Sequence, residues 1–152
     1  MTTEANERSK PSALDLDRQI CHSLYSAANA LVRAYRPLLQ ELDLTYPQYV
    51  LMMSLWQRDG VSISDLARHT RFDAGTLTPI LKRLQKKGLI ESEVAESDER
   101  RRMITVTAKG RSLKKSAERI PGRIACRVDL PLEDALALKA LCEKLVSKLA
   151  ND

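Results

Sequence analysis

The sequence predicts a mainly α-helical fold with a small β-hairpin, in which a helix-turn-helix core lies between two long terminal helices. Three observations predict it. Apolar residues recur at steps of three and four over most of the chain, short capped helices stand close together near its middle, and β-branched segments follow them directly. The length of 152 residues and the 43% hydrophobic content are typical of one globular domain.

We expect that domain over residues 14–150, after a disordered tail over residues 1–13. The tail is polar and lacks the apolar stretch of a secretory signal, and no later apolar run approaches membrane-spanning length. We therefore expect a cytoplasmic protein with no membrane partner. Cys21, Cys126 and Cys142 are odd in number and widely spaced, which argues against a disulfide framework and against a structural metal site. No cofactor is indicated.

Amphipathic helices are predicted at both ends of the domain. The apolar spacing from Leu14 to Leu42 favours one long helix, which Pro37 should kink or restart. Towards the C-terminus, over about residues 108–150, Thr107 caps a basic helix, Pro121-Gly122 interrupts it, and a final apolar stripe follows. These stripes are wider than the small core between them can cover, so we expect both ends to form the interface of a homodimer.

Capping residues divide the middle of the chain into short helices. Thr45-x-x-Gln48 and Ser62-x-x-Asp65 are capping-box patterns, and Asp73 caps a further helix that stops at Gly88. Pro79 lies inside that last helix, where it is tolerable near the first turn. The two helices that begin after Ser62 and Asp73 have the form of a helix-turn-helix.

A hairpin is predicted directly after this helix-turn-helix. Leu89–Val94 and Met103–Thr107 flank the polar turn 96–102, whose arginines give the hairpin a basic tip. This order of elements, over about residues 46–107, is that of a winged helix. In such a fold the recognition helix lies in a major groove and the wing reaches the adjoining minor groove.

Positive charge is concentrated in the same part of the chain. Residues 68–119 hold 14 Lys and Arg against 7 Asp and Glu, whereas the formal net charge of the whole chain is +5. Every Tyr, Trp and Phe lies at or before Phe72, so the basic block beyond it has no aromatic side chain to stack on an unpaired base. We therefore expect double-stranded DNA as the partner.

Three segments carry a family resemblance: LTYPQYVLMMSLW (44–56), FDAGTLTPILKRLQKKGLI (72–90) and SDERRRMITVTAKG (97–110). They resemble the MarR family of winged-helix repressors, and in particular its OhrR branch, which senses organic hydroperoxides. The similarity covers about residues 14–150. It implies a reduced homodimer that binds palindromic duplex DNA and leaves it after oxidation.

The resemblance implies that Cys21 is the residue that senses peroxide. Tyr25 lies one turn away on the same predicted helical face, Tyr35 follows on that stripe, and Tyr46 comes from the next segment. Phenol hydroxyls can stabilise the thiolate that attacks a peroxide. Spacing alone favours a buried cysteine among packing tyrosines, and it is the resemblance that implies a sensor of organic hydroperoxide.

The resemblance also implies a resolving role for Cys126. Its position matches the second cysteine of the two-cysteine sensors, which bonds to the sensing cysteine of the other subunit. The expected route is oxidation of Cys21 to a sulfenic acid, condensation with Cys126 across the dimer, and release of DNA. Cys142 has no such match and is expected to be a small buried hydrophobe.

On the DNA side, the resemblance implies contacts from the recognition helix and from the wing. Asp98 should brace Arg100, which reaches the DNA from the wing tip, and Lys87 is either a phosphate contact or a solvated cation at a helix end. Ala74 and His22 depart from the family, which has a serine and an aromatic residue there. The major-groove residues are Ala74, Gly75, Thr76, Thr78 and Lys82, and the phosphate contacts are Arg83 and Lys86.

Three functions of different classes are compatible with these residues. The first is the peroxide-switched repressor, and the second is a MarR-type repressor released by a small aromatic ligand, with Cys21 structural. The third is a thiol peroxidase. We expect no enzyme, because the sequence has no Ser-His-Asp or metal constellation and no docking site for a reductase.

Overall fold

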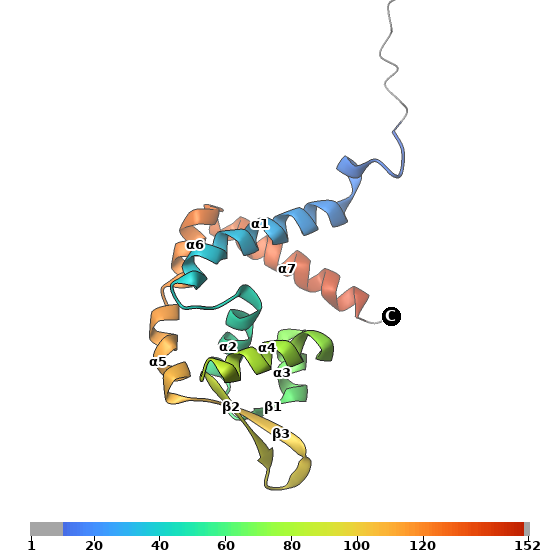
Figure 1. Cartoon of the computed structure of the whole chain (residues 1–152). Helices are drawn as coiled ribbons and strands as arrows, with labels where there is room; N and C mark the ends of the chain where they lie inside the picture. Colours follow the sequence, from blue (N-terminus) through green and yellow to red (C-terminus); the bar gives the residue numbers. More distant parts are fainter. Residues whose placement is uncertain (1–10, 151–152) are drawn as a thin grey trace, which may run out of the picture.

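The computed structural model describes residues 11–150, which form helices and one small antiparallel sheet, as predicted (Figure 1). Most of the expected tail, residues 1–10, lies outside the described residues. The helices are η1 (Leu16–Arg18), α1 (Ile20–Gln40), α2 (Tyr46–Gln57), α3 (Ile63–Thr70), α4 (Ala74–Lys86), α5 (Ala108–Ala117), α6 (Ile120–Val128) and α7 (Leu132–Leu149). The strands are β1 (Val61–Ser62), β2 (Ile90–Ala95) and β3 (Asp98–Val106), in the order β1-β3-β2.

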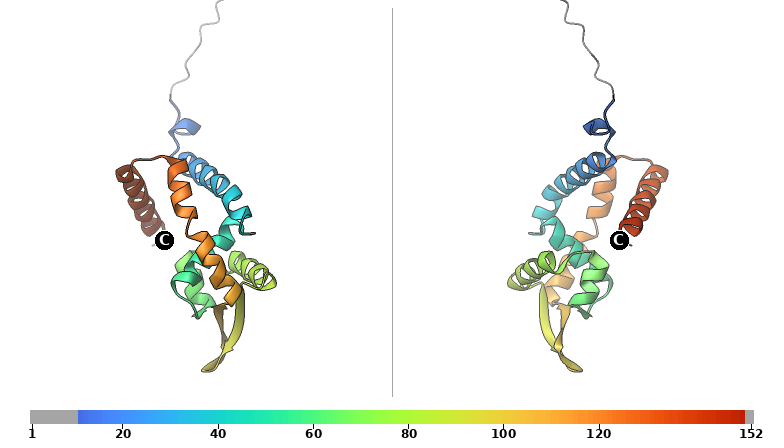
Figure 2. Two further views of the ribbon diagram at one scale, coloured as in Figure 1. Left: turned by 90° about the vertical axis from the view of Figure 1, so that its left-hand side faces the viewer. Right: turned by 90° about the vertical axis from the view of Figure 1, so that its right-hand side faces the viewer.

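The molecule has two ends with different roles in the fold. Helices α2 to α5 and the sheet form the winged-helix core, and the β2–β3 hairpin projects from one end of it (Figure 1). Helices α1, α6 and α7 lie at the other end, where α7 stands apart from its neighbours (Figure 2). Helix α7 buries no residue, although its Glu143 pairs at 2.6 Å with Arg71, the residue that follows α3.

The core is filled by apolar side chains from α2, α3, α4 and the sheet. Leu51 and Met52 of α2, Leu66 of α3 and Leu77 of α4 are fully buried. Helix α5 packs closely on this core, because a Cβ added at Gly110 would overlap the carbonyl oxygen of Leu89. These contacts hold α4 and the hairpin in a fixed relation to α2.

The predicted caps are present. Thr45 and Gln48 form a capping box, in which Gln48 N–H donates to Thr45 Oγ1 and Thr45 N–H donates to Gln48 Oε1. Ser62 Oγ accepts from Asp65 N–H, and Asp73 and Thr107 cap α4 and α5 in the same way. Local sequence therefore sets where these helices begin.

Helix α1 differs from the prediction both in where it begins and in its course at Pro37. It begins at Ile20 rather than at Leu14, because Leu14 and Leu16 are 90% and 60% exposed and find no surface to pack on. It also continues through Pro37. Proline removes only one backbone donor there, and the buried Leu38 and Leu39 anchor the last turn.

The wing also differs from its prediction. The turn is only Glu96-Ser97, so the arginines expected at the tip lie in β3. Val94 pairs with Arg102 and Ala95 with Asp98, which leaves residues 99–101 without partners in β2. This irregularity moves the basic run from the tip to the side of the hairpin.

One helix boundary and one strand were not predicted correctly. The break after α5 falls at residues 118–119, and Pro121 lies in the first turn of α6 instead of interrupting a helix, since proline suits that position. Strand β1 was not predicted because two residues carry no periodicity. It exists only through its antiparallel pairing of Val61 and Ser62 with β3.

Candidate DNA-binding and redox sites

Helix α4 separates its apolar face from its polar face along its whole length. Leu77, Ile80, Leu81 and Leu84 are buried against the core. The opposite face carries every residue predicted to contact DNA from this helix, and all of them are exposed: Ala74, Gly75, Thr76, Thr78, Lys82, Arg83 and Lys86. Gln85 is also exposed there, and the sequence interpretation had overlooked it.

Hydrogen bonds to the Asp73 carboxylate and from two threonine hydroxyls stabilise the first turns of α4. Asp73 Oδ1 accepts from Thr76 N–H at 2.8 Å, and Thr76 Oγ1 donates to Asp73 Oδ2 at 3.0 Å. The pKa of Asp73 is lowered, first by the backbone hydrogen bond from Thr76. Thr78 Oγ1 donates to the carbonyl of Ala74 at 3.0 Å, so both threonine oxygens keep free lone pairs on the exposed face.

The side of the wing forms a shallow basic cleft with the start of α3. The cleft has a volume of about 280 Å³ and is lined by Ser62, Ser64 and the arginines 100–102. Asp98 Oδ1 accepts from the backbone N–H of Arg100 at 3.0 Å, so Asp98 holds the backbone from which Arg100 projects. Ser64 was not singled out from the sequence, because only the pairing of β1 with β3 brings the start of α3 to the wing.

The three cysteines are free thiols in the described chain. Cys21, in the first turn of α1, and Cys126, on α6, are exposed, whereas Cys142 on α7 is partly covered. Helix α6 lies along the C-terminal half of α1, as the ion pair between Arg123 and Glu41 at 3.2 Å shows. Cys21 lies near the other end of α1.

The tyrosines form a cluster that excludes Cys21 within one chain. The ring centroids of Tyr35 and Tyr46 are 5.0 Å apart, and those of Tyr35 and Tyr49 are 5.8 Å apart. Tyr35 follows Cys21 by about 21 Å along the helix axis, and Tyr25 is 70% exposed. A single chain therefore does not assemble the expected pocket around Cys21, and Tyr49 is an unexpected member of the cluster.

Burial raises the pKa of Tyr35 to about 12, and the neighbouring Tyr46 and Tyr49 contribute to this shift. The hydroxyl group of Tyr35 therefore keeps its proton at neutral pH. It can donate a hydrogen bond to an anion that approaches the cluster.

Apolar grooves lie between α1 and α7. One has a volume of about 520 Å³ and is lined by Ile20, Leu24, Leu141 and Cys142, among others. A second, of about 700 Å³, extends it towards α6 and includes Leu31 and two arginines, Arg33 and Arg127. The apolar stripes of the terminal helices thus remain open in the single chain.

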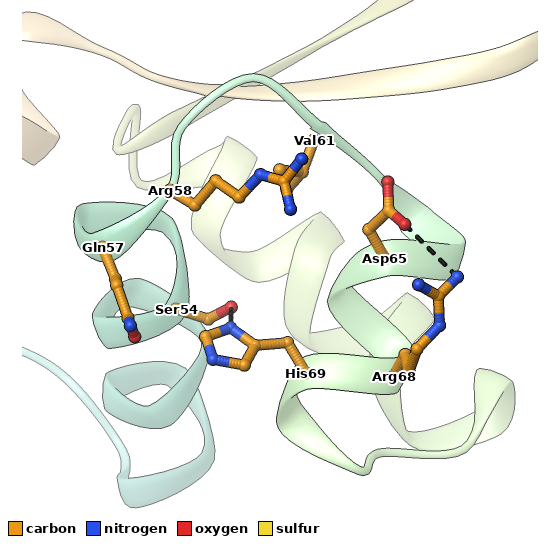
Figure 3. Close-up of a pocket in the computed structure, with 7 residues that line it drawn as sticks. All are labelled: Ser54, Gln57, Arg58, Val61, Asp65, Arg68 and His69. Carbon is orange, nitrogen blue, oxygen red and sulfur yellow. Dashed lines mark hydrogen bonds and ion pairs between the residues drawn. The ribbon is translucent and has the colours of Figure 1, made fainter.

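A polar pocket of about 420 Å³ lies between α2 and α3 (Figure 3). Ser54 Oγ and His69 Nδ1 are hydrogen-bonded at 2.7 Å, which ties the two helices together. Asp65 pairs with Arg68 at 3.3 Å and accepts from the Ser62 hydroxyl, which is the largest cause of its lowered pKa. Within residues 11–150, His69 is hydrogen-bonded to Ser54 and Asp65 to Ser62, so no carboxylate orients His69 as in a nucleophile and base relay.

Metal-binding clusters and membrane-spanning helices are both absent from residues 11–150. No group of three His, Cys, Asp or Glu side chains in this range is placed to hold a metal ion. No helix in the same range is long and apolar enough to cross a membrane.

The comparison with known proteins identifies the family. The profile of the MarR family matches residues 44–101, from α2 to the wing. The organic hydroperoxide resistance transcriptional regulator of Bacillus subtilis is 36% identical over 136 residues, which cover 90% of this chain and 92% of that protein. The chain belongs to the MarR family. This MarR-family protein is a DNA-binding transcriptional regulator and not an enzyme, as predicted.

Further relatives of this MarR-family protein support the same assignment. The regulator SarZ of Staphylococcus saprophyticus is 32% identical over 88% of this chain and 91% of its own length. Among solved structures, reduced AbfR bound to DNA superposes with a TM-score of 0.75 at 29% identity, covering 90% of this chain and 93% of that chain. AbfR comes from Staphylococcus epidermidis.

Proposed function

We propose that this protein is a repressor that binds palindromic duplex DNA as a reduced homodimer and leaves it when an organic hydroperoxide oxidises Cys21. The oxidised Cys21 then forms a disulfide with Cys126 of the partner subunit. The observation that carries the proposal is that Cys21 and Cys126 are both exposed but lie far apart within one chain, although their helices, α1 and α6, contact each other. Both helices border the open grooves that a second copy would cover.

The separation of the two thiols supports a bond between subunits. Cys126 lies three positions after Arg123, which pairs with Glu41 at the C-terminal end of α1. Cys21 lies about 30 Å from Glu41 along α1. A disulfide needs Cα atoms about 4.4–6.8 Å apart, so a second chain is the natural source of the resolving thiol.

The tyrosine cluster supports the same geometry. Tyr35 and Tyr46 are held together at the far end of α1 from Cys21. In a twofold dimer, an antiparallel approach of the two α1 helices brings the start of one helix to the end of the other. Cys21 of one subunit would then meet the phenol hydroxyls of its partner, which stabilise the thiolate.

The chemistry requires only the two thiols and the peroxide. The Cys21 thiolate attacks the terminal peroxide oxygen and the O–O bond breaks, so that the sulfur is oxidised to a sulfenic acid. The hydroperoxide is reduced to an alkoxide, which takes up a proton and leaves as the alcohol. The thiolate of Cys126 of the partner subunit then attacks the sulfenic sulfur. The S–S bond forms, and the hydroxyl group leaves as water after protonation.

The covalent step is testable by non-reducing electrophoresis and intact mass after one equivalent of cumene hydroperoxide. We expect the wild type to give a band at twice the 17.1 kDa of one chain, with two hydrogens lost per disulfide. Cys126→Ser should remain monomeric on the gel and carry a sulfenic acid that dimedone traps. Cys142→Ser is the control and should behave as the wild type, while a covalent dimer in Cys126→Ser would contradict the resolving role.

The DNA interface is proposed to combine the exposed face of α4 with the arginine-lined side of the wing. We expect Arg100→Ala to weaken binding by about 1–3 kcal/mol, because it removes a minor-groove contact. The DNA probe is a duplex selected from a random library with the reduced wild-type protein, and we call it the selected duplex. The measurement is a titration of this duplex with each protein at the same salt concentration. Lys114→Ala, in a groove with Met53 and Trp56, is the control from the same basic block. Equal affinities for Arg100→Ala and the wild type would refute this placement of the wing.

One observation favours a second candidate function, release by a small aromatic ligand. The larger groove combines apolar residues such as Leu31 with Arg33 and Arg127, which suits an aromatic carboxylate. Benzoate and salicylate titrations of the complex with the selected duplex separate the two functions. Release by these compounds with all thiols reduced would favour the second candidate, and release only by hydroperoxide, reversed by dithiothreitol, would favour the first.

A further inference from the structure

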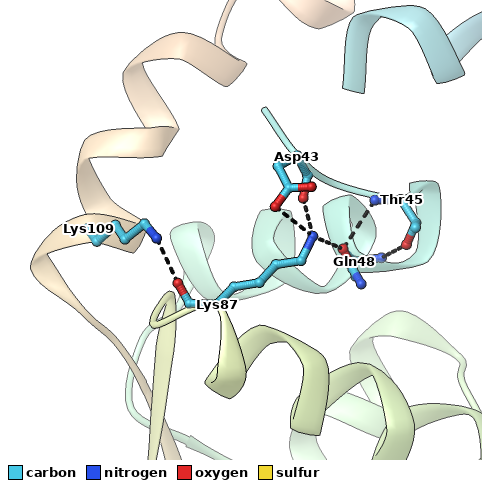
Figure 4. A network of polar contacts seen from close by, with 5 residues as sticks. All are labelled: Asp43, Thr45, Gln48, Lys87 and Lys109. Atoms are coloured by element: carbon cyan, nitrogen blue, oxygen red, sulfur yellow. Dashed lines mark hydrogen bonds and ion pairs between the residues drawn. The ribbon is translucent and has the colours of Figure 1, made fainter. Parts of the chain in front are cut away.

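The side chain of Lys87 makes contacts inside the protein. The sequence had instead predicted either a phosphate contact or a solvated cation at the end of a helix. It follows the last residue of α4, yet its side chain does not extend along the polar face of that helix. Its Nζ contacts the carbonyl oxygen of Asp43, lies 3.2 Å from Asp43 Oδ2 and donates to Gln48 Oε1 at 3.3 Å (Figure 4). The three hydrogens of the ammonium group thus have three acceptors, two on Asp43 between α1 and α2 and one on Gln48 in the first turn of α2.

The acceptors are fixed by their own environment. Gln48 is 3% exposed, and its Oε1 also accepts from Thr45 N–H in the capping box of α2. Asp43 has a left-handed φ of 52°, which turns the chain between α1 and α2. The Asp43 carboxylate is 89% exposed and adds little, so Gln48 and the backbone carbonyl are the stronger part of the link.

The end of α4 is fixed on its other side as well. Lys109 Nζ donates to the carbonyl of Lys87 at 2.8 Å, and Thr107 Oγ1 donates to the carbonyl of Gly88 at 2.7 Å. The C-terminal turn of α4 therefore lies between α5 and the start of α2. The Lys87 side chain is thus a direct polar link between the start of α2 and the end of α4.

The start of α2 also carries part of the tyrosine cluster. Tyr46 directly follows Thr45, and Tyr49 directly follows Gln48. The two rings pack on Tyr35 of α1, while Gln48 holds Lys87. One short segment thus connects the proposed peroxide pocket to the helix proposed to read DNA.

We propose that Lys87 is a positioning residue that couples the tyrosine cluster to the recognition helix, so that rearrangement at the oxidised sensor reorients α4. The inference rests on the proposed redox function and deepens it. Lys87 touches neither the peroxide nor the DNA. Without this link, α4 keeps its orientation whatever the oxidation state of Cys21.

The test compares the Kd for the selected duplex before and after oxidation, in wild type, Lys87→Met and Lys86→Met. Oxidation of Cys21 is verified by mass in every sample. We expect the oxidised-to-reduced Kd ratio to be on the order of 100 for wild type, and at least about tenfold smaller for Lys87→Met, because the oxidised variant stays on DNA. Lys86→Met should weaken both states equally and leave the ratio unchanged, since it removes only a phosphate contact.

Two further variants keep the result interpretable. Lys87→Arg retains the charge and the donors, so its ratio should stay within about threefold of the wild type. If Lys87→Met does not show the circular dichroism of the folded protein, Lys87→Gln replaces it, since glutamine is too short to reach both acceptors.

The failures of the two proposals are distinguishable. A wild-type ratio near one after verified oxidation would refute the redox function itself. A large wild-type ratio that Lys87→Met retains in full would overturn the coupling role and leave the redox function standing.

Discussion

Cys21→Ser is expected to bind the selected duplex as tightly as the reduced wild type and to stay bound when organic hydroperoxide is added. Serine has nearly the shape of cysteine, and the exposed position on α1 makes the change harmless to the core. The hydroxyl group is not ionised at neutral pH and does not attack the O–O bond. The expected effect is the complete loss of a response on the order of 100-fold.

The measurement is a fluorescence anisotropy titration of the complex with cumene hydroperoxide, followed by dithiothreitol. Cys142→Ser is the matched control, because it also replaces a cysteine by serine but leaves both proposed redox thiols in place. It should release DNA as the wild type does. Release of Cys21→Ser at the wild-type peroxide concentration would assign sensing to another residue.

Leu138→Asp is expected to convert the protein to a monomer and to reduce its affinity for the selected duplex by more than about 100-fold. Leu138 is 50% exposed and lines both grooves between α1 and α7. In a twofold dimer each such residue occurs twice, so two carboxylates lose water among apolar side chains, at several kcal/mol each. A monomer also loses the gain from engaging two half-sites at once.

Sedimentation velocity at micromolar concentration, with the same anisotropy assay, checks this expectation. Helix α7 buries none of its residues in the single chain, so the variant should keep the circular dichroism of the folded protein. Val94→Asp is the control: Val94 is also 50% exposed, but it lies on the wing, and this variant should remain dimeric. A dimeric Leu138→Asp would show that other surfaces hold the two subunits together.

Most of the fold was predictable because it is encoded in short segments. The caps at Thr45, Ser62, Asp73 and Thr107 satisfy backbone donors within three residues, so their effect does not depend on distant parts of the chain. The exposed and buried faces of α4 also follow from local periodicity. The helix-turn-helix and the order of its elements were therefore correct before any contact was known.

The errors occurred where packing decides the outcome. The helix predicted from Leu14 starts only at Ile20, because its first apolar residues meet no surface in the chain. Strand β1 and the side position of the wing arginines depend on pairing with β3, which sequence periodicity does not encode.

The sequence by itself determined the winged-helix fold, the basic recognition helix and the presence of Cys21, Cys126 and the tyrosines. Only the tertiary structure decided which of these groups meet. It gathers Tyr35, Tyr46 and Tyr49, separates both thiols within one chain, and turns Lys87 onto Gln48, 39 positions earlier in the sequence. Caps and periodicity act over a few residues, whereas contacts between distant side chains exist only after the core has fixed the helices in space.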